Sequence, residues 1–415
     1  MAEHSLAGVK VLDLSRVLAG PWCTQILGDF GADILKIEMP GRGDDTRSWG
    51  PPYLKGADGE DEIGESAYYL AANRNKRSVA VDITTPAGAG LVRRLAERAD
   101  VVVENFKVGG LGKYGLDYPA LRPLNPRLVY CSITGFGQTG PYAGRGGYDF
   151  VAQGMGGFMS ITGETGGPPL RGGVAVADLF TGMYATVSVM AALRHAERTG
   201  VGQQIDISLL DTQIAMLANQ AMNWLVGGIV PGRLGNRHPT VVPYKTFEVA
   251  DGMMVIAVGN DGQFRLLCDE IGESALGTDP RFATASARLA NRDAIEAIVE
   301  DRIAPFTKDE IIARLVARGV PAGPVNSIDQ VFADPFVEAR GAVHRFERAD
   351  GVEIPSVAFP GKLSETPADY RCPPPQVGEN TIEGLRDWLG CSDPEIDELI
   401  TAGAIVQREP DRAPA

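Results

Sequence analysis

The chain has 415 residues, of which 44% are hydrophobic and 22% are charged, and it carries a formal net charge of −14. One hydrophobic core rarely extends over so many residues, so we expect at least two domains. The negative charge disfavours nucleic acids and anionic membrane surfaces as partners. The sequence does not begin with a basic segment followed by an apolar one, and it has no apolar run of membrane-spanning length. We therefore expect a cytoplasmic protein with no membrane segment.

The cysteines and histidines argue against several kinds of site. The five cysteines lie far apart and form no Cys-x-x-Cys pair, and the four histidines form no His-Glu-x-x-His motif. We therefore expect neither disulfide bonds nor a metal site built from these residues. The scattered histidines also weigh against a serine–histidine or cysteine–histidine mechanism.

The start of the chain predicts a strand, a helix and a second strand. Residues 9–14 and 32–37 have the apolar character of strands, and Gly31 ends the helix that we expect at 22–30. Such a β-α-β unit is typical of a parallel, doubly wound sheet. The first turn lacks a Gly-x-Gly-x-x-Gly motif, so we expect no nicotinamide or flavin dinucleotide there.

The alternation of strands and helices continues along the first half of the chain. Thr85 and Pro86 suit the N-cap and the first position of one of these helices. The pattern therefore predicts an α/β fold. Further strands are expected at 79–83, 100–103, 128–133 and 203–208, with helices at 86–98 and 209–224.

Three loop segments are candidates for binding. The run 73–78 is the most basic in the chain, and it fits a solvated loop as well as an anion site. Residues 135–173 are rich in glycine, which predicts either a closing active-site loop or an inert connection. The third segment is an expected loop at 40–66, in which the clustered charges are Arg42, Asp44, Asp45 and Arg47.

The character of the sequence changes at 227–240, where glycine and proline are typical of a linker. Strands at 241–249 and 253–258 then predict a hairpin, which we assign to a second, smaller α+β domain. The elements expected after the hairpin are helices at 263–271, 287–303 and 308–318, a strand at 352–358, and helices at 381–389 and 393–402.

Asp178 is the one acidic residue between Arg171 and Arg194. It follows a glycine pair and a short strand-like run at 174–177, and an apolar helix begins beside it. Aspartate is a favoured cap in the first turn of a helix, and the helix dipole stabilises its charge, so we expect Asp178 to be ionised at neutral pH. A carboxylate held in this way also suits covalent catalysis. From these residues alone, a capping role and a nucleophilic role both stay open.

Several motifs together resemble the family III CoA-transferases, also called the CaiB/BaiF type, which include formyl-CoA transferase. The resemblance runs in order along essentially the whole chain. Residues 242–247 and 399–405 are most similar to the dicarboxylate branch, typified by succinate–hydroxymethylglutarate CoA-transferase. The other matching motifs lie at 17–23, 34–38, 75–78, 100–106, 125–129, 135–137 and 182–183.

The resemblance implies a Rossmann-like large domain at 1–226, a linker at 227–240 and a small α+β domain at 241–345. It implies that the chain returns to the large domain at 346–415 and that two ring-like chains interlock as a homodimer. No tightly bound cofactor is implied, because coenzyme A and acyl-CoA are substrates.

The resemblance also implies the reaction. Succinyl-CoA is the expected donor, and a small carboxylic acid, expected to be a dicarboxylate, is the acceptor. Asp178 matches the position of the family's nucleophile, which passes through anhydride and aspartyl-CoA thioester intermediates.

The resemblance further implies which residues bind CoA. Some relatives have an arginine at the position of Met39, so one phosphate contact stays open there. Lys107 and Lys113 are implied at the phosphates, and Tyr148 and Asp149 at the acyl end. The full implied set is Leu18, Ala19, Met39, Val81, Asp82, Ile83, Thr84, Asn105, Phe106, Lys107, Lys113, Tyr148 and Asp149.

Two alternatives to CoA transfer stay open on the sequence. A racemase branch that acts on 2-methylacyl-CoA has a histidine where this chain has Tyr148, so no base for the α-proton is apparent. A non-catalytic acyl-CoA-binding paralogue is the second alternative, and the presence of Asp178 weighs against it.

Overall fold

The structure is a computed structural model that describes residues 4–348 and 350–408. Its chain forms two compact units. Unit 1 comprises Met1–Phe158, Arg171–Gly227 and Glu338–Ala415, and unit 2 comprises Met159–Leu170 and Gly228–Val337. The domain boundaries expected from the sequence stay predictions.

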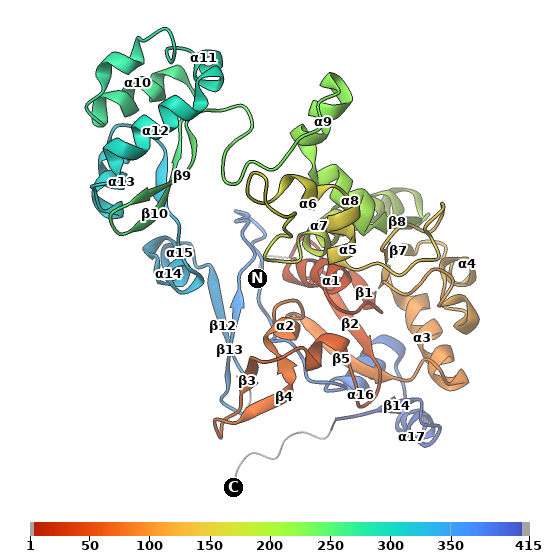
Figure 1. Cartoon of the computed structure of the whole chain (residues 1–415). Coiled ribbons are helices and arrows are strands. Elements are labelled where there is room, and N and C mark those ends of the chain that lie inside the picture. Colours follow the sequence, from red (N-terminus) through yellow and green to blue (C-terminus); the bar gives the residue numbers. More distant parts are fainter. Residues whose placement is uncertain (1–3, 349, 409–415) are drawn as a thin grey trace. The chain divides into compact units, whose positions relative to one another are not determined.

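Unit 1 is built on a seven-stranded sheet with the order β14-β5-β2-β1-β6-β7-β8 (Figure 1). All neighbours pair in parallel except β14, which runs antiparallel to β5. This sheet confirms the predicted α/β fold. Its strands are β1 Lys10–Asp13, β2 Asp33–Glu38, β5 Lys76–Val81, β6 Val101–Glu104, β7 Val129–Thr134, β8 Gln204–Ser208 and β14 Ile405–Val406.

Side chains of these strands alternate between two hydrophobic layers, as the two-residue period of a strand requires. Leu12 and Leu35 face the layer that includes α3 and α16. Val11 and Ile34 face the layer that includes α1 and α7. The principal helices of unit 1 are α1 Ala19–Asp29, α3 Pro86–Arg98, α7 Val176–Thr199, α8 Leu209–Met216, α9 Ala218–Gly227, α16 Thr381–Leu389 and α17 Asp393–Thr401.

The order of the strands reverses between β1 and β6. The chain runs from β1 outward through β2 to β5, then crosses back to β6 and continues outward through β7 and β8. In sheets of this kind, ligands bind at the carboxyl ends of the strands at such a reversal. The loops that begin after Asp13 and Glu104 are therefore the first place to look for a site.

The sequence correctly predicted the residues at the end of α1 and at the start of α3. Gly31 follows α1 with a φ of +102°, which glycine adopts readily. The Thr85 side chain accepts a hydrogen bond from the N–H of Gly88, and Pro86 is the first residue of α3. These signals depend only on neighbouring residues, so they can be recognised in the sequence.

Other expectations were wrong. Residues 174–177 do not form a strand, because α7 already begins at Val176. The helix expected at 209–224 is two helices, interrupted where Ala218 has a φ of +44°. The loop expected at 40–66 contains the hairpin of β3 Tyr53–Lys55 and β4 Asp61–Ser66. Its polar sequence lacks the apolar alternation by which strands are recognised.

By length and composition alone, α7 could cross a membrane, since its most apolar window has a mean hydropathy of 1.5. However, 44% of that window is buried inside this fold. Ala185, Val189 and Ala192 pack in the same hydrophobic layer as the sheet. In this structure α7 is therefore a core helix of unit 1.

The smaller elements of unit 1 include a β-hairpin near the C-terminal end of the described chain, where β12 and β13 pair. The sequence predicted only β13. Besides β3 and β4, these elements are η1 Asp45–Ser48, α2 Ala67–Leu70, η2 Gly112–Tyr114, α4 Tyr118–Leu121, α5 Asp149–Met155, β12 Val343–Glu347 and β13 Glu353–Val357. Two short helices cross the limits of the units, α6 Phe158–Ile161 and α15 Pro335–Ala339.

Unit 2 has a three-stranded antiparallel sheet with the order β11-β10-β9. The predicted hairpin is confirmed as β9 and β10. The helix expected at 287–303 is two helices that meet at Asn291. The elements are β9 Tyr244–Val249, β10 Gly252–Ala257, α10 Asp261–Glu270, η3 Ser274–Gly277, α11 Ala285–Ala290, α12 Arg292–Ile303, α13 Lys308–Ala317, β11 Ala322–Pro324 and α14 Ile328–Ala333.

A buried ion pair holds the loop that follows β1. The Lys36 ammonium donates to the Asp44 carboxylate and to the Ser15 carbonyl, each at 2.9 Å, and both charged side chains are fully buried. Asp44 also accepts the N–H of Val17, whose φ of +72° is strained for a β-branched residue. Burial alone would raise the pKa of Asp44, but Lys36 and the N–H of Thr46 outweigh burial and lower the pKa to about 2.

The substitution Asp44→Ala should lower the free energy of unfolding by about 3–5 kcal/mol, because it leaves the Lys36 ammonium buried without its carboxylate. Urea denaturation followed by fluorescence measures this change. Glu97→Ala, at an exposed position of α3, is the control and should change the stability by less than about 0.5 kcal/mol. Equal stability of the two variants would contradict this role of the ion pair.

Candidate active site

Asp178 lies in the first turn of α7, as the sequence predicted, but it is not the N-cap. The N-cap is Ala175, whose side chain has no hydrogen-bonding group, so Asp178 is the third residue of the helix. The prediction that the Asp178 side chain caps this helix as its N-cap residue is therefore wrong. The Asp178 side chain is not needed to accept hydrogen bonds from the first N–H groups of the helix, because another residue accepts them.

That residue is Asp149, the buried first residue of α5. One of its carboxylate oxygens accepts the N–H of Ala177 at 2.8 Å and that of Asp178 at 3.4 Å. The other oxygen accepts the Gln153 side-chain amide at 2.6 Å. Gln153 in turn accepts the N–H of Gly172 at 2.9 Å. The carboxylate of one helix thus caps another helix and fixes the loop that leads into it.

The pKa of Asp178 is raised from 3.8 to about 7, first by burial and second by the negative charge of Asp149. The sequence led us to expect an ionised group at neutral pH, but a carboxyl with this pKa is only partly ionised there. The favourable effect of a helix N-terminus is worth about 0.3–1 kcal/mol. The rise in the pKa of Asp178 from 3.8 to about 7 corresponds to about 4 kcal/mol in the opposite direction. Burial and the neighbouring carboxylate therefore decide the protonation of Asp178.

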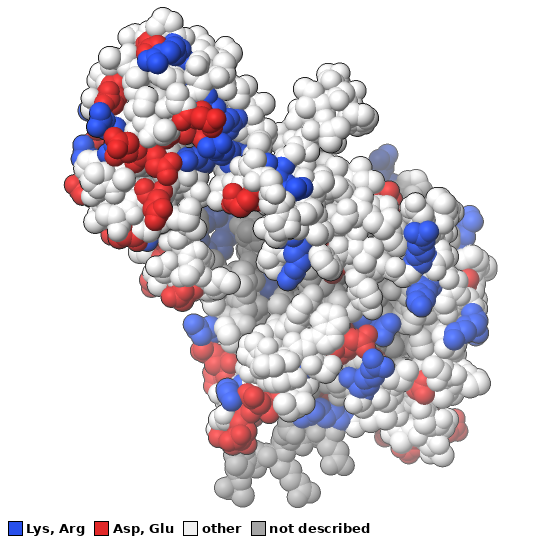
Figure 2. All heavy atoms as spheres, viewed as in Figure 1, with Lys and Arg blue, Asp and Glu red and all other residues white. Residues whose placement is uncertain are grey.

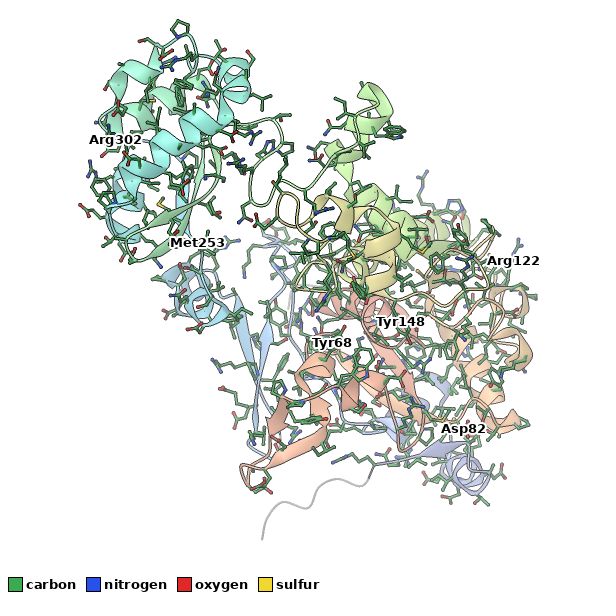
Figure 3. All side chains as sticks on the ribbon, viewed as in Figure 1. Tyr68, Asp82, Arg122, Tyr148, Met253 and Arg302 are labelled. Atoms are coloured by element: carbon green, nitrogen blue, oxygen red, sulfur yellow. The ribbon has the colours of Figure 1, made fainter. Side chains whose placement is uncertain are left out.

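Two tyrosines belong to the surroundings of this turn (Figure 3). Burial raises the pKa of Tyr68 to about 12, with further contributions from the charges of Asp178, Asp149 and Asp44. Tyr68 lies in α2 and packs edge to face against Trp49. Tyr148 is 69% exposed and directly precedes Asp149. Tyr68 was not among the predicted site residues, because nothing near it in the sequence indicates that the charge of Asp178 acts on it.

Helices α1 and α7 approach closely beside Asp178. A Cβ atom added to Gly182 would lie 2.7 Å from the Ala19 carbonyl oxygen and 3.0 Å from the Cβ of Trp22. Position 182 must therefore be glycine for this packing. Leu18 and Ala19 are buried at the start of α1. Of these two predicted residues, Ala19 thus packs against α7 at Gly182, one helical turn after Asp178, and Leu18 directly precedes Ala19.

A pocket of about 180 Å³ opens at the carboxyl ends of β1, β2, β5 and β6. It lies where the strand order of the sheet reverses. Of the residues implied to bind CoA, Met39, Val81, Ile83, Thr84 and Phe106 line it. The other lining residues are Leu14, Arg16, Ile37, Glu38, Arg42, Gly43 and Tyr114.

The remaining implied residues lie around the pocket rather than in its lining. Asp82 accepts hydrogen bonds from the N–H and hydroxyl of Thr84 and lies far from Tyr148 in this view (Figure 3). Asn105 binds the backbone of Arg16. Lys107 is exposed, and so is Lys113, whose ammonium lies 4.6 Å from the ring centre of the lining residue Tyr114.

Arg16 and Arg42 line the pocket, although they were not among the residues implied to bind CoA. Arg42 belongs to the charge cluster noted in the sequence at 40–66. The clustered charges could be recognised in the sequence, but the sequence did not show which pocket they line. No group of three or more His, Cys, Asp or Glu side chains among the described residues is arranged to hold a metal ion.

The substitution Asp149→Asn removes the charge beside Asp178 and keeps a side-chain oxygen for the N–H of Ala177. We expect the pKa of Asp178 to fall by about one unit. Infrared spectra are recorded at a series of pH values for each protein and for the same protein carrying Asp178→Asn. The difference between the two spectra measures the titration of Asp178. Asp206→Asn, at a carboxylate that binds the N–H of Gln138 instead, is the control. An unchanged titration in Asp149→Asn would contradict the electrostatic coupling.

Comparison with known proteins shows the family of this chain. The family model for CoA-transferase family III matches residues 6–381. The chain is 53% identical to the succinate–glutarate CoA-transferase of Agrobacterium fabrum, over 92% of this chain and 95% of that protein. It is 40% identical to the human succinyl-CoA:glutarate CoA-transferase, over 97% of this chain and 90% of that protein.

A solved structure of a related protein supports the same family assignment. The crystal structure of a CAIB/BAIF family protein from Brucella suis superimposes with a TM-score of 0.82 at 49% identity. The match covers 93% of this chain and all of that chain. The chain belongs to CoA-transferase family III and is an enzyme that acts on CoA thioesters.

Proposed function

We propose that this enzyme transfers CoA from succinyl-CoA to a dicarboxylic acid, with glutarate as the first candidate acceptor. The observation that carries this proposal is the 53% identity, over nearly the whole chain, to a relative named for succinate and glutarate. Further relatives are named for mesaconate and for D-citramalate, and each of these names also includes succinyl-CoA. Dicarboxylate acceptors are thus common to these relatives.

We propose Asp178 as the nucleophile. Its carboxylate attacks the thioester carbon of succinyl-CoA, which gives a mixed anhydride and releases the CoA thiolate. The thiolate then attacks the aspartyl carbonyl and releases succinate, leaving an aspartyl-CoA thioester. The acceptor carboxylate attacks this thioester, which forms a second anhydride and releases the CoA thiolate again. The thiolate finally attacks the acceptor's acyl carbon, so that the new acyl-CoA leaves and the Asp178 carboxylate is restored.

The environment of Asp178 supports this role. Burial and the charge of Asp149 destabilise the Asp178 carboxylate, as its raised pKa shows. An anion that is poorly stabilised gains more from forming a covalent bond, so perturbed groups of this kind are characteristic of active sites. Asp149 is saturated by hydrogen bonds to α7 and Gln153. We therefore assign it a positioning role rather than direct contact with the acyl group.

We propose that the pocket at the strand ends holds the nucleotide part of CoA. Val81, Ile83 and Phe106 supply its apolar lining, and Thr84 and Met39 lie beside them. The loop that begins at Arg16 leads from this pocket to Leu18 and Ala19, next to α7. This loop gives the pantetheine arm a path toward Asp178, with Tyr148 near the acyl end. Asp82, Asn105, Lys107 and Lys113 border the pocket in this proposal.

We propose a homodimer in which two ring-like chains interlock. Phe180, Met183, Tyr184, Val187 and Met190 are exposed and follow the three- and four-residue spacing of one helix face on α7. Exposed apolar patches of this kind mark interaction surfaces. Helix α9 also has no charged residue and projects from unit 1 as an uncharged surface (Figure 2). The domain layout at 1–226, 241–345 and 346–415 and a cytoplasmic location belong to the same proposal.

The direct test of the transfer reaction incubates the enzyme with succinyl-CoA and a panel of acids, and identifies the CoA esters by mass spectrometry. We expect glutaryl-CoA and other dicarboxylyl-CoA esters to form. Products from monocarboxylates alone would contradict the proposed acceptor class. Exchange of the α-hydrogen of an acyl-CoA for deuterium, without transfer, would instead identify a racemase.

The substitution Asp178→Ala should abolish transfer, because no other group can carry the acyl intermediates, while the dissociation constant for CoA changes less than about threefold. Isothermal titration calorimetry measures the binding, and the mass assay measures the transfer. Asp206→Ala is a matched control and should retain transfer. Near-normal exchange by Asp178→Ala would rule out its proposed role.

The α7 face gives a prediction about assembly. Val187→Asp with Met190→Asp introduces charges into the stripe at positions away from Asp178, so we expect dimers to separate into monomers. Light scattering after size-exclusion chromatography measures the mass. A wild-type protein with the mass of one chain would contradict the proposed dimer.

A further inference from the structure

We infer that Arg16 and Arg42, joined by Asp45, bind a phosphate group at the adenosine end of CoA. The inference rests on the proposed function, in which the pocket at the strand ends holds that part of the substrate. It assigns phosphate binding to two arginines instead of the implied lysines Lys107 and Lys113.

The charges that line the pocket support this assignment. Arg16 and Arg42 are the two basic residues of its lining, and Glu38 is the acidic one. Glu38 is already bound by the Arg47 guanidinium through two hydrogen bonds, at 2.9 and 2.7 Å. Its charge is therefore compensated within the protein. What the pocket offers to a ligand is positive charge, which an enzyme with a net charge of −14 must concentrate locally to hold phosphates.

Asp45 holds the two arginines at one place. Its carboxylate accepts one hydrogen bond from Arg16 at 2.9 Å and one from Arg42 at 2.5 Å. A guanidinium group has five N–H donors, so one bond to Asp45 leaves most of each group's donors for a ligand. The three groups together carry one net positive charge. A shared carboxylate thus orders the two guanidinium groups without using up their binding capacity.

Arg16 is fixed to the part of the site that is implied to line the nucleotide. The Asn105 side chain accepts the N–H of Arg16 at 2.9 Å and donates to its carbonyl at 2.7 Å. The guanidinium carbon lies 5.5 Å from the ring centre of Phe106, which lines the pocket. The side chain is 44% exposed, so it remains accessible to a ligand.

Arg42 lies on the turn that begins at Met39. The Met39 carbonyl accepts the N–H of Arg42 at 3.3 Å and that of Gly43 at 2.9 Å, which closes the turn beside the pocket. A methionine cannot bind a phosphate by charge. Arg42 supplies the charge from three positions further along the same turn, with a side chain that is 73% exposed. Planar guanidinium groups suit phosphate oxygens because they can bind two of them at once.

The test compares two fragments of CoA as ligands, adenosine 3′,5′-bisphosphate and adenosine. Their dissociation constants are measured by calorimetry with the full chain and with the Arg16→Gln and Arg42→Met variants. Loss of one charge-assisted contact should weaken bisphosphate binding about tenfold or more in each variant. Adenosine binding should change less than about twofold, because it has no phosphate. Arg122→Met, at an exposed position labelled in Figure 3, is the control and should leave both affinities unchanged.

If these arginines have only a structural role, the substitutions should weaken the binding of both ligands by a similar factor. This result would overturn the inference. Bisphosphate affinities within about twofold of wild type in both variants would also overturn it. These measurements need no turnover. Failure of the inference is therefore distinguishable from failure of the proposed reaction, which the mass assay tests.

Discussion

The candidate site depends on one contact, in which the buried Asp149 carboxylate accepts the N–H groups of Ala177 and Asp178. This contact satisfies the start of α7, whose own N-cap residue, Ala175, cannot do so. It leaves the Asp178 side chain free of a capping role. It also places a second negative charge close by, which together with burial raises the pKa of Asp178 to about 7. One interaction thus both positions Asp178 and contributes to its raised pKa.

The rest of unit 1 brings substrate-binding groups to the same edge of the sheet. The strand order reverses at β1 and β6, so the loops after these strands separate and leave a pocket. Lys36 and Asp44 hold the first of these loops in a strained conformation at Val17. Strain of this kind persists only where surrounding contacts enforce it, and it is common in active sites. Gly182 then allows α1, the helix that follows this loop, to approach α7.

Features that depend on neighbouring residues could be predicted from the sequence. The alternation of strands and helices, the end of α1 at Gly31 and the cap of α3 at Thr85 are of this kind. So was the position of Asp178 in the first turn of a helix. Strands with little apolar alternation, such as β4, were missed, because their pairing is not apparent from their own residues.

Features that depend on distant residues could not be predicted. The protonation of Asp178 depends on Asp149, which lies 29 positions earlier and reaches α7 only in the fold. Arg42 and Asp45 were noticed as clustered charges, but the turn that brings them beside Arg16 was not apparent. In this chain, sequence reasoning placed Asp178 in the first turn of its helix, but it did not place the charges around that turn.

The central claim is that Asp178 becomes covalently acylated and then carries the thiol of CoA in each cycle. Hydroxylamine added during turnover converts such activated aspartyl groups into a stable hydroxamate, which peptide mass spectrometry detects. We expect the modification at Asp178, only when succinyl-CoA is present. The account would be contradicted if the Asp178 peptide is recovered unmodified while CoA exchange proceeds, and if hydroxylamine inhibits this exchange by modifying another residue.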